Sequence, residues 1–356
     1  MKFVHIADMH FDAPFTFLSQ KKDLGDLRRV EQRQVLKKII QYIKENNIKY
    51  FFISGDLYEH EYIRKSTIEF IDNCFKEIPD TNIFISPGNH DPFIKNSYYN
   101  QYNWSKNVHI FRSQIERIEM PEADIYGFGF NDFTCNRVNI ENINIENKEK
   151  LNLLIIHGSL DSSDKLQMQY NPIMTSVLKQ KRFDYVALGH IHKTNYSENT
   201  KFVYPGSTMS LGFDELGEHG MIIGDVEKNK LNLEFKKLDD RKFVEKEIDI
   251  TNINSKEDLI QIINEQVLEE QNMYKIILIG KRNFEINVND IEKSVLLDNI
   301  IKIKNKTKMN YNLEELAKEK SLKGIFVKKM LEKLNSGSYE QEEIEKAIEI
   351  VLDVLY

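Results

Sequence analysis

The chain has 356 residues, of which 41% are hydrophobic, so it is long enough for two or three domains with a sizeable core. Its net charge of −7 argues against a protein that coats nucleic acid with a globally basic surface, although not against a local groove along phosphates. The chain has two cysteines, Cys74 and Cys135, which lie far apart in the sequence and not in the spacing of metal ligands, and this indicates a reduced, cytosolic protein. The start MKFVHIADMH lacks a signal-peptide core, and no apolar run is long enough for a bilayer, so we expect a cytoplasmic protein without membrane association.

Five short apolar runs lie in the first part of the chain, and each ends in a polar residue that can ligate a metal. They are KFVHIAD (2–8), YFFISGD (50–56), NIFISPGNH (82–90), LNLLIIH (151–157) and FDYVALGHIH (183–192). Their length and their Ile, Val, Phe and Leu content predict buried strands. Helical periodicity separates several of them. This alternation predicts an α/β fold, in which sites form beyond the carboxyl ends of the strands.

The pattern changes after about residue 238. One strand-like, one apolar and two helical stretches follow up to about residue 300, and they predict a small α+β unit without catalytic-looking residues. A polar, basic connector or surface strand leads from there to a helical tail. The predicted domains are 1–238, 239–305 and 306–356.

The polar residues at the five strand ends form one candidate site. They are Asp8, His10, Asp56, Asn89, His90, His157, His190 and His192. Carboxylate, imidazole and amide groups without thiolates suit Mn²⁺, Fe or Zn²⁺ better than a soft metal. Eight such groups are too many for one ion, whereas two ions roughly 3.5–4 Å apart, bridged by Asp56, would use them.

Such a pair of ions binds phosphate oxygens and activates water for in-line attack on phosphorus. His90 follows Asn89 directly, so we expect it to stabilise the charge that develops or to protonate the leaving group. Asp91 is expected to orient His90 and to raise its pKa. His90 and Asp91 are therefore the candidate catalytic residues.

Five motifs of the chain resemble those of a known superfamily. The motifs D-x-H (8–10), GD (55–56), GNHD (88–91), HG (157–158) and GHIH (189–192), in this order, are similar to those of calcineurin-like metallophosphoesterases. A narrower resemblance is to the SbcD-type nucleases of DNA double-strand-break repair. It rests on the opening HIADMHFDAPF, the YPGS motif (204–207), GFDELGEHG (212–220) and the DDRKF-strand-helix-strand unit that follows.

The resemblance implies a two-sheet α/β sandwich of the metallophosphoesterase type, with a small α+β capping domain and a helical C-terminal tail. One metal would bind Asp8, His10, Asp56 and His192. The second would bind Asp56, Asn89, His157 and His190. Mn²⁺ would be preferred, with Fe, Zn or Mg possible. In several relatives a histidine three residues after the bridging aspartate helps to hold nucleic acid, whereas this chain has Glu59 there and His60 next to it. These two are therefore candidate substrate-binding residues.

The same resemblance implies a Mn²⁺-dependent 3′→5′ DNA exonuclease, with single-strand endonuclease activity as an option, that forms dimers. The 239–305 unit would guide DNA, and the helical tail would attach to an SMC-like ATPase of the SbcC type. Two alternatives stay open. One is a phosphoesterase of small phosphodiesters, nucleotides or phosphoproteins, and the other is a DNA-end-binding protein that regulates an ATPase.

Several residues outside the site have two interpretations. His5 lies out of phase with the ligand pair and is expected in the core, whereas His60, His109 and His219 are expected at the surface. The aromatic residues of segment 98–104 could stack on bases or form a packing cluster. The apolar stripe of the last helix could pack on its own domain or dock to a partner helix. Its members are Ile344, Ala347, Ile348, Val351, Leu352 and Leu355.

Overall fold

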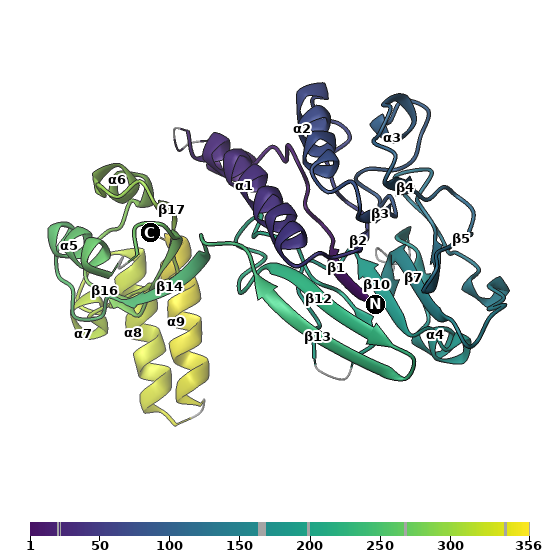
Figure 1. Ribbon diagram of the computed structural model, residues 1–356. Helices are drawn as coiled ribbons and strands as arrows, with labels where there is room; N and C mark the ends of the chain where they lie inside the picture. The colour runs from purple at the N-terminus through teal and green to yellow at the C-terminus, as the bar shows by residue number, and fades with distance from the viewer. Residues whose placement is uncertain are drawn as a thin grey trace. The chain divides into compact units, whose positions relative to one another are not determined.

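The computed structural model describes residues 1–19, 21, 23–162, 169–197, 200–266, 269–337 and 340–355. The chain divides into two compact units (Figure 1). Unit 1 comprises Met1–Val244 and Glu269–Met273, and unit 2 comprises Glu245–Leu268 and Tyr274–Tyr356. Strands and helices alternate along unit 1, which confirms the predicted α/β class.

Unit 1 is built on two β-sheets. The order in the six-stranded sheet is β13 (Lys230–Lys237), β12 (Gly220–Glu227), β1 (Lys2–Ile6), β2 (Tyr50–Ile53), β3 (Asn82–Ile85) and β4 (Val108–Ile110). The order in the five-stranded sheet is β11 (Phe202–Val203), β10 (Tyr185–Gly189), β7 (Leu151–His157), β6 (Ala123–Gly127) and β5 (Glu116–Glu119). Strands β1 to β4 are parallel, as are β6, β7, β10 and β11, and the five predicted strands are all present.

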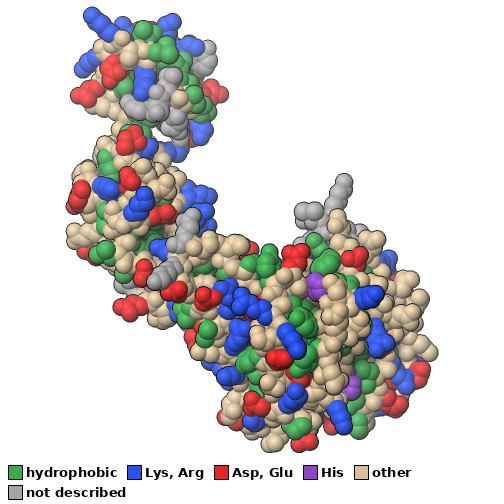
Figure 2. All heavy atoms as spheres, turned by 90° about the horizontal axis from the view of Figure 1, so that it is seen from above, with side chains coloured by type: hydrophobic (Ala, Val, Ile, Leu, Met, Phe, Trp, Pro, Cys, Tyr) green, Lys and Arg blue, Asp and Glu red, His purple; other side chains and the backbone are tan. Residues whose placement is uncertain are grey.

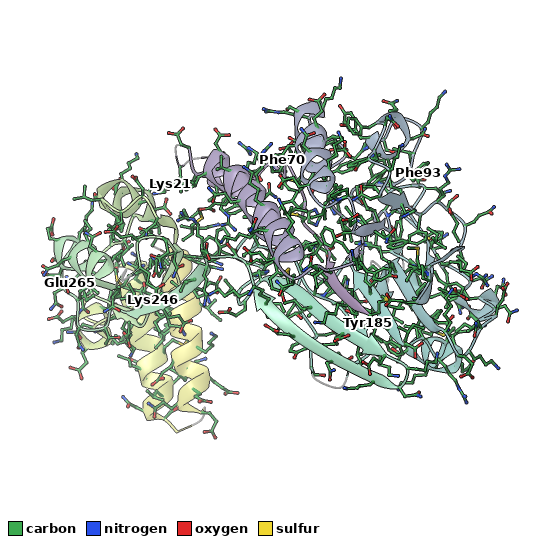
Figure 3. All side chains as sticks on the ribbon, viewed as in Figure 1. Lys21, Phe70, Phe93, Tyr185, Lys246 and Glu265 are labelled. Carbon is green, nitrogen blue, oxygen red and sulfur yellow. The ribbon has the colours of Figure 1, made fainter. Side chains whose placement is uncertain are left out.

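The two sheets face each other across an apolar core. Alternate residues of a strand point to opposite faces, so Phe3 of β1 points toward the second sheet while Val4 points away from it. Phe3 lies in one apolar cluster with Leu153 of β7, and its ring centroid is 4.6 Å from that of Tyr185 of β10, which Figure 3 labels. Because both faces of these parallel strands are covered, their sequences are almost continuously apolar.

Helices cover the outer faces of both sheets. Helices α1 (Leu24–Glu45) and α2 (Lys65–Lys76) pack on the six-stranded sheet, and α4 (Thr175–Lys181) packs on the five-stranded one. The apolar residues of α1 recur at helical spacing and form its buried face. Phe70 of α2 lies under Arg33 and Lys37 of α1 and links the two helices (Figure 3). Shorter elements of unit 1 are η1 (Thr16–Leu18), α3 (Tyr98–Gln101), η2 (Ile140–Asn142), β8 (Ser159–Leu160) and β9 (Pro172–Ile173).

The aromatic residues near α3 form a packing cluster. Trp104 lies against Tyr99, Tyr102 and Phe75, with ring centroids 5.3–6.1 Å apart. Tyr99 is buried, and its hydroxyl donates a hydrogen bond to Asp91. The structure therefore favours packing over base stacking for these rings, and it connects the cluster to the loop that carries Asn89 and His90.

Unit 2 contains a small sheet followed by helices. The sheet order is β14 (Phe243–Asp249), β15 (Met273–Ile279) and β17 (Ile300–Asn305), and β16 (Lys281–Arg282) pairs with β18 (Lys308–Met309). The helices are α5 (Lys256–Gln266), α6 (Val288–Ser294), α7 (Leu313–Leu316), α8 (Leu322–Asn335) and α9 (Gln341–Leu355). Helix α6 ends at Ser294, whereas the second of the two predicted helical stretches was expected to extend to about residue 300. The buried Ile300 and Ile303 instead belong to the edge strand β17, because a strand can bury them against β15.

The apolar stripe of α9 packs within the helical tail. Ile344, Ile348 and Leu352 are buried in one cluster with Leu316 of α7 and Val327 of α8. These three residues therefore pack against α7 and α8 of the same tail and are not available to a partner. Ile350 and Val354, which lie on another face of α9, are exposed.

In the part of the chain that the structure describes, no helix combines the length and the apolarity needed to cross a membrane.

His5 is a core residue, as predicted. It is fully buried in β1, with Nδ1 2.8 Å from the Tyr185 hydroxyl and Nε2 2.9 Å from Oγ of Ser54. Burial lowers the pKa of His5 to about 3. The imidazole is therefore neutral in the folded protein at any pH at which the fold is expected to function.

We expect this histidine to make folding stability fall as the pH decreases. Below about pH 6.5 His5 is protonated in the unfolded chain, whereas in the folded chain it stays neutral down to about pH 3. The contribution of His5 to the free energy of unfolding therefore falls by about 1.4 kcal/mol for each unit that the pH decreases within that window. Chemical unfolding of the chelator-treated protein at pH 7 and pH 5 measures this slope. A His5→Gln variant should be less stable at pH 7 and show a smaller loss between the two pH values. An unchanged slope would contradict a neutral His5.

Candidate metal centre

The candidate site lies where five parallel strands end. Strands β1, β2 and β3 of one sheet and β7 and β10 of the other lead into turns that carry all the predicted ligands. Four ligands adopt positive φ angles, 51° at Asp8, 49° at His10, 52° at Asp56 and 104° at His190. Such angles are strained for residues other than glycine, and they cluster at functional sites because the surrounding fold holds them.

Glycines before the ligands allow the strand ends to approach closely. Gly55 has a φ of 90°, and a Cβ at this position would lie 2.3 Å from Nδ1 of His157. A Cβ on Gly189 would lie 1.8 Å from the Ser54 carbonyl oxygen. The Gly-Asp and Gly-His pairs of the sequence therefore reflect the close contact of the two sheets at this edge.

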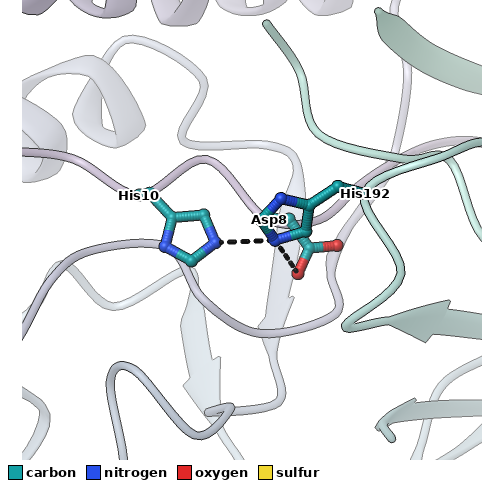
Figure 4. Close-up of side chains that lie close together, drawn as sticks. All are labelled: Asp8, His10 and His192. Atoms are coloured by element: carbon teal, nitrogen blue, oxygen red, sulfur yellow. Dashed lines mark hydrogen bonds and ion pairs between the residues drawn. The ribbon is translucent and has the colours of Figure 1, made fainter. Parts of the chain in front are cut away.

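Asp8, His10 and His192 form the first group of potential ligands (Figure 4). Nε2 of His10 and Nε2 of His192 lie 3.1 Å apart, and Nε2 of His192 lies 3.9 Å from Oδ1 of Asp8. The Asp8 carboxylate also accepts from the backbone N–H of His190, at 3.0 and 3.1 Å. This bond ties the end of β1 to the end of β10.

Asp56, Asn89, His157 and His190 form the second group. Oδ1 of Asn89 lies 3.0 Å from Nε2 of His157 and 3.2 Å from Nδ1 of His190. Oδ2 of Asp56 lies 3.3 Å from Nε2 of His157 and 3.9 Å from Nε2 of His10 of the first group. Asp56 thus lies beside both groups and could ligate an ion held by either of them.

The hydrogen bonds of the histidines show that these donors fit cations. Nδ1 of His10 donates to Glu59 at 2.7 Å and Nδ1 of His192 donates to Glu215 at 2.5 Å. Each neutral ring would therefore direct the lone pair of Nε2 at the other ring. His157 is similar, because its Nδ1 donates to the Ser54 carbonyl at 2.8 Å and its Nε2 faces oxygens. Lone pairs repel at these distances unless a proton or a metal ion lies between them, so the set fits divalent cations.

The pKa values show the same need for positive charge. Burial lowers the pKa of His157, but Asp56 outweighs burial and raises it to about 9. Burial also opposes protonation of His192, where Glu215 and Asp8 raise the pKa to about 9. Burial and the neighbouring His157 lower the pKa of His190 to about 3, so this ring is neutral. A metal ion must displace protons from His157 and His192 in order to bind.

His90 lies at the open side of the site and is held by Glu59. Its side chain is 44% exposed, its backbone N–H donates to Oδ1 of Asp56 at 2.8 Å, and its Nδ1 donates to Oε2 of Glu59 at 2.9 Å. Burial opposes protonation of the ring, but the bond to Glu59 outweighs it and raises the pKa of His90 to about 9. His90 can therefore present a protonated Nε2 to a bound anion.

The charge of Asp91 is among those that raise the pKa of His90, as predicted, but the hydrogen bond that orients the His90 ring is made to Glu59. The carboxylate of Asp91 is buried and accepts from the backbone N–H groups of Gly88, Asp56 and Leu57, at 2.7–3.0 Å, and from the hydroxyl of Tyr99. Its role is to hold together the turns that carry Asp56 and Asn89. Glu59 makes the bond to His90 instead, because its longer side chain approaches from the neighbouring strand end.

Two residues of the site could not be assigned from the residue pattern. Glu215, which holds His192, lies in the polar segment GFDELGEHG, where no periodicity distinguishes one acidic residue from another. His219 is not at the surface as expected. It is buried, and its Nε2 donates to the backbone carbonyl of Glu215 at 2.8 Å, while its Nδ1 lies 2.9 Å from Oγ of Ser207. His219 thus fixes the loop of Glu215.

His60 lies apart from the ligand groups among the described residues. Its ring contacts Phe133, with centroids 5.7 Å apart, and its backbone N–H donates to the carbonyl of His90. Of the two candidates for substrate binding, Glu59 is within the site and His60 is beside it.

The sequence profile of calcineurin-like phosphoesterases matches residues 1–194, which is more than half of the chain and includes every predicted ligand. The chain belongs to the calcineurin-like phosphoesterase family. It is therefore a metal-dependent hydrolase by family. Among the residues that the structure describes, three groups of Asp and His residues could hold divalent ions, namely Asp8, His10 and His192; His10, Asp56 and His90; and Asp56, His157 and His190.

Two curated proteins are similar over most of the chain. The uncharacterized metallophosphoesterase YhaO of Bacillus subtilis is 25% identical over 276 residues, which cover 74% of this chain and 67% of that protein. The D subunit of the nuclease SbcCD of Staphylococcus epidermidis is 27% identical over 269 residues, which cover 65% of this chain and 67% of that protein.

Two solved structures share a distant similarity of 12% sequence identity. The match to TT1561 of Thermus thermophilus covers 66% of this chain and 98% of the TT1561 chain, with a TM-score of 0.36. The match to GAP50, described as the anchor in the inner membrane complex of Plasmodium, covers 67% of this chain and 84% of the GAP50 chain, with a TM-score of 0.37. Similarity at this level does not bear on function.

The residues of the family site have separable chemical tasks. Divalent ions bound there would polarise a phosphoester and activate a water molecule. Asp56 holds the two groups of ligands together, and the glutamates fix the orientation of His10 and His192. The exposed His90 can donate a hydrogen bond to a phosphate oxygen or a proton to a leaving group.

We expect metal binding to release protons. His157 and His192, with pKa values of about 9, are protonated at pH 7, and an ion that takes their lone pairs displaces about two protons per chain. Metal affinity should consequently weaken as the pH decreases. Calorimetric titration with Zn²⁺ or Mn²⁺ in buffers of different ionisation enthalpy counts the released protons. His192→Gln should reduce the count by about one and His109→Gln, outside the site, should not change it. Equal release by wild type and His192→Gln would contradict the assignment.

Proposed function

We propose that the protein is a two-metal, Mn²⁺-dependent phosphodiesterase that cleaves DNA as a 3′→5′ exonuclease in double-strand-break repair, with single-strand endonuclease activity as a second mode. The observation that carries the proposal is the convergence of seven potential ligands beside an exposed histidine. The ligands are Asp8, His10, Asp56, Asn89, His157, His190 and His192. A phosphodiester that bridges two ions would have its leaving group within reach of such a histidine.

The similarity to a nuclease supports DNA as the substrate. The SbcCD nuclease chain of Staphylococcus epidermidis is similar over 65% of this chain, a larger share than the part that the family profile matches. Loops beyond residue 194 also serve the site, because Glu215 and His219 hold His192 in place. Ser207 of segment 204–207 contacts both Glu215 and His219 of segment 212–220, and these contacts beside His192 support the narrower resemblance.

A row of lysines on unit 2 supports its role as a DNA-guiding, or capping, unit. Lys302, Lys304 and Lys306 are exposed and alternate along the edge strand β17 and its extension. Alternate residues of a strand share one face, about 7 Å apart, so their ammonium groups can follow a line of phosphates. Figure 2 shows Lys and Arg interspersed with Asp and Glu over the surface in view, as expected for a chain with a net charge of −7. Binding would therefore depend on local rows such as this one.

The partners are proposals as well. We propose that the protein forms a homodimer and that its helical tail docks to an SMC-like ATPase of the SbcC type. The similarity to one subunit of a nuclease supports the view that such chains act in an assembly. On the tail, Leu322 and Ile325 of α8 and Ile350 and Val354 of α9 are exposed apolar side chains that a partner could cover.

Digestion of end-labelled duplex DNA tests the proposed activity. With Mn²⁺ we expect loss of the 3′ label, and His90→Gln should retain its metals and lose about 10²–10⁴-fold in rate. Near-complete activity of His90→Gln would show that its assigned role is wrong. Parallel assays with bis(p-nitrophenyl) phosphate and cyclic nucleotides distinguish the alternatives. Turnover of the small esters without DNA cleavage would indicate a small-molecule phosphoesterase, and DNA binding without any turnover would indicate a regulatory protein.

The lysine row predicts a change in salt dependence. Each lysine that neutralises a phosphate contributes about −0.9 to the slope of log K against log salt concentration for duplex DNA. The triple variant Lys302→Gln, Lys304→Gln, Lys306→Gln should therefore reduce the magnitude of the slope by about 2–3, measured by fluorescence anisotropy between about 50 and 200 mM salt. Replacing Lys201, an exposed lysine of unit 1, is the control. An unchanged slope in the triple variant would mean that β17 merely carries charge as a solvated edge strand.

A further inference from the structure

We propose that Glu59 is a positioning residue whose single carboxylate holds a metal ligand and the phosphate-facing histidine at the same time. Oε1 accepts a hydrogen bond from Nδ1 of His10 at 2.7 Å, and Oε2 accepts one from Nδ1 of His90 at 2.9 Å. The rings of His10 and His90 lie in an edge-to-face arrangement with centroids 4.7 Å apart. Both oxygens of Glu59 are thus used, and each fixes a different functional group.

The backbone holds Glu59 in the position that this double contact requires. The N–H of Glu59 donates to the carbonyl of Phe11, the residue after His10, at 3.0 Å. The N–H of His60 donates to the carbonyl of His90 at 2.9 Å. The side chain of Glu59 is only 17% exposed. Residues 59 and 60 therefore connect the loop of His10 to the loop of His90 through both backbone and side chain.

The two contacts have different consequences. At His10, the bond to Nδ1 turns the lone pair of Nε2 toward the metal centre and makes the ring a stronger ligand. At His90, it fixes the plane of the ring and leaves Nε2 for the phosphate or the leaving group. A carboxylate can accept at both oxygens, whereas a glutamine has one acceptor and would direct its N–H₂ at the second Nδ1. An aspartate retains the charge but is one methylene shorter.

Glu215 provides a comparison within the same site. Its Oε1 accepts from Nδ1 of His192, and its Oε2 accepts from Oγ of Ser207 and the backbone N–H of Leu211. Glu215 therefore supports one metal ligand and, among its hydrogen bonds to described residues, makes none to His90. Loss of Glu215 should affect metal binding, whereas loss of Glu59 should affect metal binding and the step that uses His90.

Four variants separate these roles, namely Glu59→Gln, Glu59→Asp, Glu215→Gln and the control Glu61→Gln, whose side chain is exposed. Metal affinity is measured by calorimetry, and kcat is measured at saturating Mn²⁺ with bis(p-nitrophenyl) phosphate and with end-labelled DNA. We expect Glu59→Gln and Glu215→Gln to lose about 10–100-fold in metal affinity. Saturating Mn²⁺ should restore kcat in Glu215→Gln, whereas both Glu59 variants should stay about 10²-fold below wild type. Glu61→Gln should match wild type.

A double-mutant cycle tests whether Glu59 acts through His90. In the background of His90→Gln, adding Glu59→Gln should cost no further kcat at saturating Mn²⁺, since the group that it positions is already absent. Recovery of full kcat by Glu59→Gln with excess metal, or additive losses in the double variant, would overturn the proposal. Retention of wild-type kcat by Glu59→Asp would overturn the requirement for two simultaneous contacts.

The inference rests on the phosphodiester hydrolysis proposed above, so one measurement is independent of activity. Nitrogen-15 NMR of the histidine rings in the Mg²⁺-loaded protein shows which ring nitrogens carry hydrogen, and His90→Gln identifies the His90 signals. We expect Nδ1 of His90 to carry hydrogen in wild type and in Glu215→Gln. In Glu59→Gln the nitrogen-15 signal of this atom should change, because its acceptor has been replaced. An identical His90 spectrum in Glu59→Gln overturns the inference. A wild-type protein that cleaves neither substrate but shows the expected spectra contradicts the proposed function alone.

Discussion

The site depends on the close approach of electron-rich groups at the ends of five parallel strands. Imidazole nitrogens and carboxylate and amide oxygens face one another at 3.0–3.9 Å, and Asp56 contacts both groups of ligands. Such an arrangement is unfavourable without positive charge between the donors, because their own lone pairs and charges repel in a buried environment. Protons on His157 and His192 or divalent ions can supply that charge. The requirement for cations thus follows from the packing of the strand ends.

The rest of unit 1 holds this unfavourable arrangement in place. Asp8, His10 and Asp56 have positive φ angles, a backbone strain of about 1–3 kcal/mol each that only an over-determined structure can maintain. The apolar residues between the two sheets supply the rigidity, and the carboxylate of Asp91 holds the turns of Asp56 and Asn89 through backbone N–H groups. Burial of large apolar side chains and the hydrogen bonds at the sheet edge both stabilise the fold. Together they compensate for the backbone strain at Asp8, His10 and Asp56.

The groups around the ligands give the site its asymmetry. His10 and His192 of the first group donate to glutamates, whereas His157 of the second group donates to the backbone carbonyl of Ser54. A carboxylate increases the electron density of an imidazole more than a neutral carbonyl does, so the two groups differ as metal ligands although their residue types are similar. Family membership accounts for a hydrolase of this kind. The exposed lysines of β17 and the loop that carries Glu215 lie outside the set of ligands, and substrate selection by them is part of the proposed function.

The sequence by itself determined the five strands, the α/β class and the residues that converge, because each strand is a continuous apolar run that ends in a ligand-type residue. It also determined the burial of His5, whose position in the first strand is out of phase with Asp8 and His10. Only the tertiary structure decided which side chains hold the ligands. Glu59 replaces Asp91 as the partner of His90, and Glu215 and His219 support His192, through contacts between segments that are up to 31 residues apart along the chain and have no periodic signal. The sequence left a connector and a surface strand open for the segment after α6, and pairing with β15 decided for the strand β17, since a short alternating segment becomes a strand only when a neighbouring edge can bury its isoleucines.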